Sequence, residues 1–190
     1  MTRTELRTIP ALPLALALAA LMAITRYKHG GAPGLLPDAS LAVFLLGGFY
    51  LARLRWFAFF LGVAALADQA AIRWGAVSEW CLTPAYAFLV PAYGAAWLAG
   101  WWVARAPLRG ARAAGRVALA FAAGTASWFA ISNAGFYLFS GYFADIPAGE
   151  YAARVLEYFP PYAAAAAFYV GLAAALHALF AFARARRALA

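Results

Sequence analysis

The sequence predicts an all-α, polytopic integral membrane protein with six transmembrane helices. Of its 190 residues, 67% are hydrophobic and 12% are charged, whereas soluble domains are about 45–50% apolar and about 25% charged. A water-soluble fold of this length has too little interior to bury so many apolar residues. At roughly 20 residues per crossing, six helices with short links use nearly the whole chain. We therefore expect a single membrane domain over residues 1–190.

The uncharged stretches place the helices at about residues 9–25, 37–53, 55–72, 83–104, 117–139 and 160–183. The first stretch follows Arg3 and Arg7 as in a signal peptide, but no small-residue cleavage site follows it, so we interpret it as a retained helix. The second, Ala39–Ala52, has fourteen residues, which rise only about 21 Å as a helix, less than the hydrocarbon core of about 30 Å. We expect Leu35 and Leu36 to extend it, or the bilayer to thin locally.

The remaining stretches have distinct features. The third stretch, Trp56–Ile72, contains Asp68 as its only charge, and its tight link to the second, Arg53-Leu54-Arg55, predicts an antiparallel hairpin. The fourth carries Pro84 and Pro91 near its start, where a missing backbone donor or a kink is tolerated. The fifth and sixth contain no Asp, Glu, Lys or Arg.

The distribution of charge predicts the orientation. Eleven Lys and Arg residues fall at the two termini and in the second and fourth links, and four fall on the opposite side. Acidic residues show the reverse bias, with Asp38, Glu79, Asp145, Glu150 and Glu157 in the odd-numbered links. Both termini should therefore be cytoplasmic, in a membrane that the chain crosses several times. The net charge of +8 arises from this pattern, so it does not indicate nucleic-acid binding.

Small residues recur along the first helix at Ala11, Ala15, Ala19 and Ala23. A stripe of this kind lets another helix approach closely. It is consistent with ordinary packing inside an alanine-rich protein, or with a docking face for a partner subunit or a second copy.

Few side chains in the sequence can do chemistry, and the topology brings most of them to the outer boundary. His29 lies in the first outer link, and Asp68 lies about one turn from the outer end of the third helix. Cys81, the only cysteine, lies in the third outer link beside Trp80, and Tyr86 lies about one turn into the fourth helix. These groups come from three segments of the chain, and we expect them to lie close together at the outer membrane boundary.

Each of these groups has a structural interpretation beside a functional one. Asp68 should face the bundle interior or a water-filled cavity, because a carboxylate in lipid is costly. It either caps a helix or pairs with Arg73, or it accepts hydrogen bonds from a histidine, a tyrosine or a ligand amide. His29 is equally consistent with a solvated loop position. His177, near the cytoplasmic end of the sixth helix, is interpreted as structural.

Cys81 is either a small packing residue or a reactive thiolate. It precedes Thr83-Pro84, which resembles a helix start, and a helix N-terminus favours the thiolate that attacks electrophiles and binds metals. One cysteine and one histidine do not provide the ligands of a protein zinc site. A metal at this position would more plausibly arrive inside its own chelate.

His29, Asp68 and the segment Trp80-Cys81-Leu82-Thr83-Pro84-Ala85-Tyr86, on a small six-helix membrane protein, resemble the BtuM family. These are small cobalamin transporters related to the substrate-binding S-components of energy-coupling factor transporters. The resemblance implies an S-component-like bundle that takes up cobalamin (vitamin B12), and it implies Cys81 as an axial ligand of the cobalt. It also implies that an energy-coupling module could dock on the alanine stripe.

The same resemblance assigns roles around the ligand. Cys81, His29, Asp68 and Tyr86 would carry any chemistry, including thiolate-assisted removal of an upper cyanide ligand. Trp80 would join them in binding. The corrin would be contacted by aromatic residues near the outer boundary, namely Trp80, Tyr86, Phe136, Tyr137, Tyr142 and Tyr158, for which an interfacial belt is the alternative. Arg154, the only basic residue of the fifth outer link, would neutralise a thiolate or a ligand phosphate.

Two other functions remain open at this point. The protein could be a membrane enzyme unrelated to corrinoids, with Cys81 as nucleophile, His29 as base and Asp68 as the group that orients the base. It could also be a scaffold without a ligand. A coloured, cobalt-containing protein favours the transporter, whereas a colourless protein that reacts stoichiometrically at Cys81 favours the enzyme.

Overall fold

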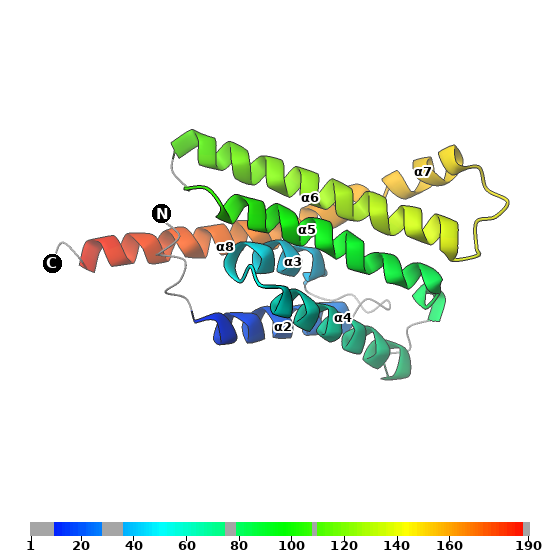
Figure 1. Ribbon diagram of the computed structural model, residues 1–190, viewed down its shortest axis with the longest axis horizontal. Helices are drawn as coiled ribbons and strands as arrows, with labels where there is room; N and C mark the ends of the chain where they lie inside the picture. The colour runs from blue at the N-terminus through cyan, green and yellow to red at the C-terminus, as the bar shows by residue number, and fades with distance from the viewer. Residues whose placement is uncertain (1–9, 28–35, 75–78, 108–109, 188–190) are drawn as a thin grey trace.

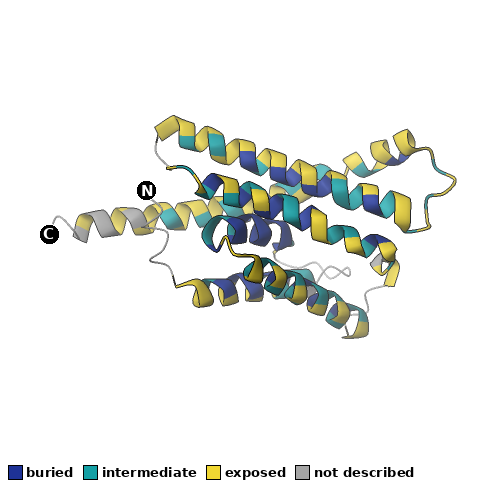
Figure 2. Ribbon diagram, in the orientation of Figure 1, coloured by how far each residue is buried: buried dark blue, intermediate teal, exposed yellow. Residues whose placement is uncertain are grey.

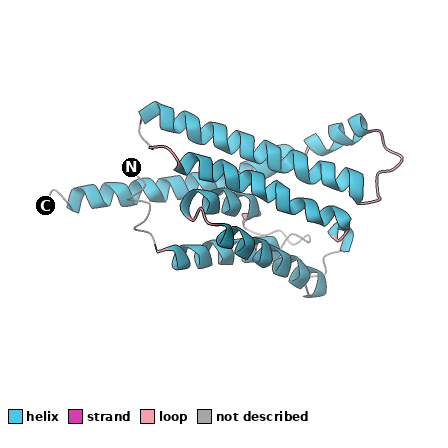
Figure 3. Cartoon of the chain, in the orientation of Figure 1, coloured by secondary structure: helices cyan, strands magenta, loops and turns pink. Residues whose placement is uncertain are grey.

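The computed structural model describes residues 10–27, 36–74, 79–107 and 110–187. These residues form seven α-helices and two short 3-10 helices, and they contain no β-strand (Figures 1 and 3). The elements in chain order are α2 (Ala11–Tyr27), α3 (Ser40–Tyr50), α4 (Leu54–Trp74), η1 (Glu79–Cys81), η2 (Pro84–Phe88), α5 (Leu89–Ala104), α6 (Gly110–Phe139), α7 (Ala148–Leu156) and α8 (Phe159–Arg187). The predicted all-α class is confirmed.

Four segments of the described chain are long and apolar enough to cross a membrane: Leu54–Trp74, Pro84–Ala104, Gly110–Phe139 and Phe159–Phe180. They agree with a membrane protein. Two further apolar helices, α2 and α3, are shorter, so the prediction of six full crossings is not established by helix length.

The second predicted helix, 37–53, is wrong at both ends, because α3 has only eleven residues. At its start, Asp38 Oδ1 accepts hydrogen bonds from the backbone N–H and the hydroxyl of Ser40, at 2.9 and 2.6 Å. Leu36 lies outside the helix and does not extend it. At the other end, the backbone N–H groups of Leu51 and Ala52 both donate to the carbonyl of Gly47, and Ala52 has a φ of 53°. These local bonds limit α3 to a length of about 16 Å.

Other predicted bounds also need correction. The predicted fourth helix, 83–104, is divided into η2 and α5, because Pro91 has no N–H to donate to the carbonyl of Ala87 four residues earlier. The fifth helix begins at Gly110, about two turns before residue 117, since arginine stems can lie along an apolar surface. The region before α8, expected to be a link, contains the amphipathic helix α7.

The short helix α3 occupies the centre of the bundle, and most of its surface is buried (Figure 2). Eight of its eleven residues are buried, and it packs most closely against α5. A Cβ atom at Gly48 would overlap the backbone carbonyl of Trp97, and one at Gly100 would overlap the carbonyl of Leu45. The two backbones thus approach closely through glycines, which is a common way for membrane helices to associate.

The alanine stripe of α2 is used mainly inside the chain. Ala15 and Ala19 are buried in the core cluster, Ala23 is half-buried and Ala11 is exposed. The helix packs along α4 and against α3. The middle of the stripe is therefore covered by the chain itself, as its packing interpretation required.

Candidate functional site

A cavity of about 360 Å³ lies at the end of the bundle where α2 and α4 end and η2 begins, which we name the Asp68 end. Its walls come from α2, α4, the η1–η2 region, α5, α6 and α8. They include Arg26, Asp38, Asp68, Trp80, Leu82, Tyr86, Tyr93, Ser132, Asn133, Phe136, Tyr158 and Tyr162. The lining contains both polar groups and aromatic rings, so the cavity can hold a ligand that has both apolar and polar surfaces.

The central polar feature is an ion pair between Arg26 and Asp68. Arg26 Nε donates to Asp68 Oδ1 at 2.6 Å, and Nη2 donates to Oδ2 at 2.7 Å. The Tyr86 hydroxyl also donates to Oδ2, at 2.6 Å. The side chains of Arg26 and Asp68 are only 10% and 20% exposed. This bidentate pair joins α2, α4 and η2, and such charge-assisted bonds are the strong ones.

The network continues from Arg26 into the centre of the bundle. Arg26 Nη1 donates to the Tyr93 hydroxyl at 2.8 Å and to Ser40 Oγ at 3.1 Å. Ser40 Oγ in turn donates to Asp38 Oδ1 at 2.6 Å. Two carboxylates and one guanidinium therefore stand together at the cavity wall. Carboxylate oxygens only accept hydrogen bonds, so this wall suits a ligand group that donates them.

The partner of Asp68 differs from one of the sequence interpretations. Asp68 pairs with Arg26, not with Arg73, and it accepts a hydrogen bond from a tyrosine, as the functional interpretation expected. In the sequence, Arg26 is one of the four basic residues that predict the outer side. Arg26 lies at the outer end of the first helix and Asp68 lies about one turn from the outer end of the third, so the two opposite charges stand at a similar depth.

Aromatic rings form the rim of the cavity. The rings of Trp80 and Tyr142 are stacked with centroids 4.1 Å apart and an interplanar angle of 14°. Phe136 contacts both rings, at 6.4 and 6.0 Å between centroids. Trp80 and Tyr142 are both exposed. Trp80 lines the cavity and Tyr142 is stacked on it, so the pair offers an exposed aromatic surface to a broad ligand.

Cys81 is the last residue of η1, and its two neighbours, Trp80 and Leu82, both line the cavity. The backbone therefore carries Cys81 along the cavity edge. The side chain of Cys81 and the whole of His29 lie outside the described residues. Within the described part of the chain, no three His, Cys, Asp or Glu side chains gather in a way that could hold a metal ion.

Three predicted site residues do not line the cavity, namely Arg154, Tyr137 and Tyr142, although Tyr142 is stacked on the lining residue Trp80. Arg154 lies on the exposed side of α7 and pairs with Glu150 one turn away. The Tyr137 hydroxyl donates to the backbone carbonyl of Ile146 at 2.8 Å. Tyr151 anchors α7 by donating to the carbonyl of Asn133 at 3.1 Å, and burial raises the pKa of its hydroxyl above the ordinary value. These residues hold the region between α6 and α8 in place.

The second histidine, His177, lies toward the opposite end of the bundle. Its Nδ1 is hydrogen-bonded to the hydroxyl of Tyr50 at 2.9 Å, which connects α8 to α3. This bond agrees with the structural interpretation of His177.

Comparisons with known proteins give no family and no relative for this chain. No protein-family model matches the chain, and no curated protein is significantly similar to it. Function is therefore inferred from the cavity and its residues.

Proposed function

We propose that the protein binds cobalamin in the cavity at the Asp68 end and takes it up across a bacterial inner membrane. The observation that carries the proposal is the composition of this cavity. Its lining includes a carboxylate network that is mostly buried and several aromatic rings, and the backbone at Cys81 runs between two lining residues.

The surface chemistry of a corrinoid matches these groups. Its ring is broad and partly apolar, which suits the stacked rings of Trp80 and Tyr142. Its edge carries amides, whose N–H groups can donate to the carboxylates of Asp38 and Asp68, while Asn133 can both donate and accept.

The cobalt supplies the reason for a single cysteine. Four positions around the metal are filled by corrin nitrogens, so only the axial positions are open, and a thiolate is a soft ligand for one of them. If the ligand carries an upper cyanide, formation of the Co–S bond accompanies heterolysis of the Co–C bond. Cyanide then leaves with the electron pair, and the oxidation state of cobalt does not change.

The size of the cavity restricts the binding mode. Binding pockets for drug-sized ligands are about 300–1,000 Å³, and this cavity, at about 360 Å³, is near the lower limit. A whole corrinoid is larger than the enclosed volume. The cavity would hold one edge or face of the ring, and the remainder would lie against the aromatic rim.

The orientation belongs to the same proposal. With both termini in the cytoplasm, as the Lys and Arg distribution indicates, the Asp68 end faces outward and receives the ligand from that side. The protein would work alone or with an energy-coupling module. Because Ala15 and Ala19 are buried, a module on α2 would contact the exposed face that includes Leu12 and Leu16.

The visible spectrum of bound corrinoid tests the proposal directly. Purified protein is titrated with cyanocobalamin and with hydroxocobalamin, and free and bound ligand are separated by size. We expect near-stoichiometric binding and a band shift from thiolate ligation. Cys81→Ser replaces the thiolate with a protonated hydroxyl, so it should abolish the shift and weaken binding.

A matched control separates ligation from cavity shape. Leu82→Ala removes a neighbouring lining side chain, so it should weaken binding but retain the band shift in whatever ligand remains bound. Unchanged affinity and spectrum in the Cys81→Ser protein would refute cobalt ligation. A parent protein that binds neither corrinoid and reacts stoichiometrically at Cys81 with disulfide reagents would favour the thiol-dependent enzyme instead.

A further inference from the structure

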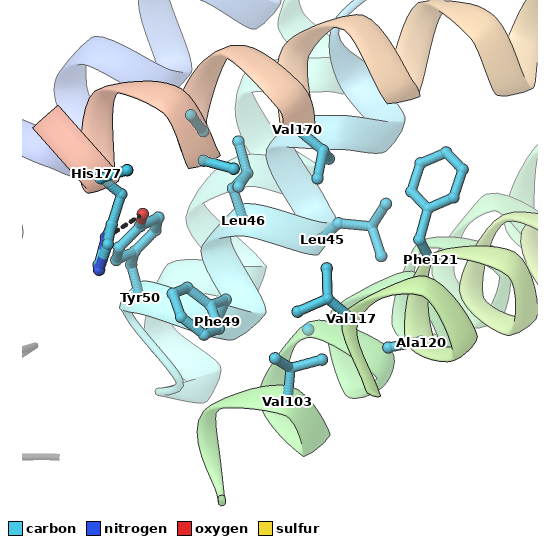
Figure 4. A pocket seen from close by; sticks show the side chains of 14 residues that line it. Leu45, Leu46, Phe49, Tyr50, Val103, Val117, Ala120, Phe121, Val170 and His177 are labelled. Carbon is cyan, nitrogen blue, oxygen red and sulfur yellow. Dashed lines mark hydrogen bonds between the residues drawn. The ribbon is translucent and has the colours of Figure 1, made fainter. Parts of the chain in front are cut away.

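A second cavity, of about 200 Å³, lies toward the opposite end of the bundle, which we name the His177 end (Figure 4). Its walls are the second half of α3, the end of α5, the beginning of α6 and the second half of α8. Leu45, Val103, Val117 and Val170 are among its side chains. It shares no lining residue with the cavity at the Asp68 end. The two cavities are therefore separate features of the fold.

The lining of this second cavity is almost entirely aliphatic and aromatic. Its side-chain polar groups are the Tyr50 hydroxyl and the His177 ring, and these are hydrogen-bonded to each other at 2.9 Å. Their mutual bond reduces any need for water in the cavity. Apolar cavities stay dry and accept apolar guests, and about 150 Å³ is enough for benzene. The apolar lining therefore favours a hydrocarbon group as the occupant of this cavity.

The cavity opens between two helices that are candidates to face lipid. Near the Asp68 end, α6 and α8 are in contact through the rings of Phe129 and Phe159, whose centroids are 5.2 Å apart. Toward the His177 end, the cavity lies between the same two helices. Val117 on α6 and Ala174 on α8 form its exposed lip. In a bilayer, the hydrocarbon available at such an opening is an acyl chain of a lipid.

Two arginines are close in sequence to residues that line this cavity. Arg116 directly precedes Val117 on α6, and Arg105 follows Val103 by two residues at the end of α5. The guanidinium groups of Arg105 and Arg116 lie 3.7 Å from the ring centroids of Trp101 and Trp102, and Arg116 also donates to the backbone carbonyl of Trp102. The acidic residues in the described part of the chain all belong to the other end, at Asp38, Asp68, Glu79, Asp145, Glu150 and Glu157.

We propose that the cavity at the His177 end binds one acyl chain of an anionic phospholipid, whose headgroup lies against Arg105 and Arg116. Guanidinium groups form strong charge-assisted bonds with phosphate oxygens, and basic pockets between membrane helices suit anionic headgroups. The apolar cavity provides the site for the chain, and the arginines determine the class of lipid. This proposal does not depend on cobalamin binding.

Lipid retention measured by native mass spectrometry tests the proposal. Detergent-purified protein is incubated with palmitoyl-oleoyl phosphatidylglycerol or with phosphatidylcholine that has the same chains. We expect the parent to retain one phosphatidylglycerol molecule and much less phosphatidylcholine. Ala174→Phe, which fills the cavity from its exposed lip, should lower retention at least roughly tenfold, equivalent to losing the burial of about two methylene groups.

The matched control is Ala175→Phe, the same change at the neighbouring exposed position that does not line the cavity. It should retain lipid like the parent. Ala178→Phe is a second lip variant if Ala174→Phe gives no folded protein, and the Arg105→Gln and Arg116→Gln proteins should retain both lipids equally. Unchanged phosphatidylglycerol retention in a folded lip variant would overturn the chain site. Equal retention of both lipids by the parent would overturn the anionic class and leave only a general apolar site.

Discussion

Replacing Asp68 with asparagine perturbs the polar network at its centre. The asparagine amide keeps one acceptor for Arg26, so one of the two bonds, at 2.6 and 2.7 Å, is lost. Arg26 then carries a positive charge that is 90% buried and no longer compensated by Asp68. Removing one partner of a buried pair costs about 3–5 kcal/mol. Because Asp68 itself is 20% exposed, we expect the lower limit, a loss of about 3 kcal/mol.

Thermal unfolding of detergent-purified protein, followed by circular dichroism, measures this loss. For a chain of this length, about 3 kcal/mol corresponds to a decrease of roughly 6–12 °C in Tm. Arg73→Gln on the same helix, at an exposed position, is the control and should change stability by less than about 0.5 kcal/mol. The double variant Arg26→Met with Asp68→Leu should be less destabilised than the sum of its single changes. Strictly additive effects would refute the reasoning, because they would show that the two charges do not interact.

Three further predictions concern the fold, the surface and the orientation. Gly100→Ala should lower the free energy of unfolding by at least about 2 kcal/mol, because its Cβ overlaps a backbone carbonyl of α3. Gly171→Ala, in open space on α8, should raise it by about 0.5–1 kcal/mol. Equal melting temperatures of the two variants would contradict the close α3–α5 contact. Glu150→Gln, which breaks an exposed pair on α7, should change stability by less than about 0.5 kcal/mol, and a larger effect in the same melts would indicate a wider role. Arg112→Cys in a Cys81→Ser background should resist an impermeant thiol reagent added to intact cells, and efficient labelling would reverse the predicted topology.

The helices could be predicted from the sequence because uncharged apolar stretches and membrane-spanning helices have similar lengths. Their ends could not, because they depend on local bonds that composition does not record. The hydrogen bond that the Ser40 backbone N–H donates to Asp38 lies at the start of α3, and the left-handed conformation of Ala52 follows its end, so together they limit its length. Helix α7 was interpreted as a link because Glu150 and Arg154 make it polar, although the burial of Tyr151 on α6 stabilises it as a helix.

The candidate site was predicted in part. Alternation of the helices was enough to place Asp68, Trp80 and Tyr86 at one end, and the structure gathers these three around one cavity. The partner of Asp68 required tertiary information, because Arg26 and Arg73 are both at a depth close to that of Asp68, and helix packing decides which of them it meets. The burial of Ala15 and Ala19 likewise depends on which helix packs against α2.

The shortness of α3 leaves space at both of its ends. The helix spans about 16 Å, roughly half of a hydrocarbon core of about 30 Å. Asp38, two residues before α3 begins, lines the cavity at the Asp68 end. The second half of α3, from Leu45 to Tyr50, borders the cavity at the His177 end. A helix that crossed the whole core in this central position would occupy part of the volume that these two cavities now hold, so the truncation of α3 is what makes room for them.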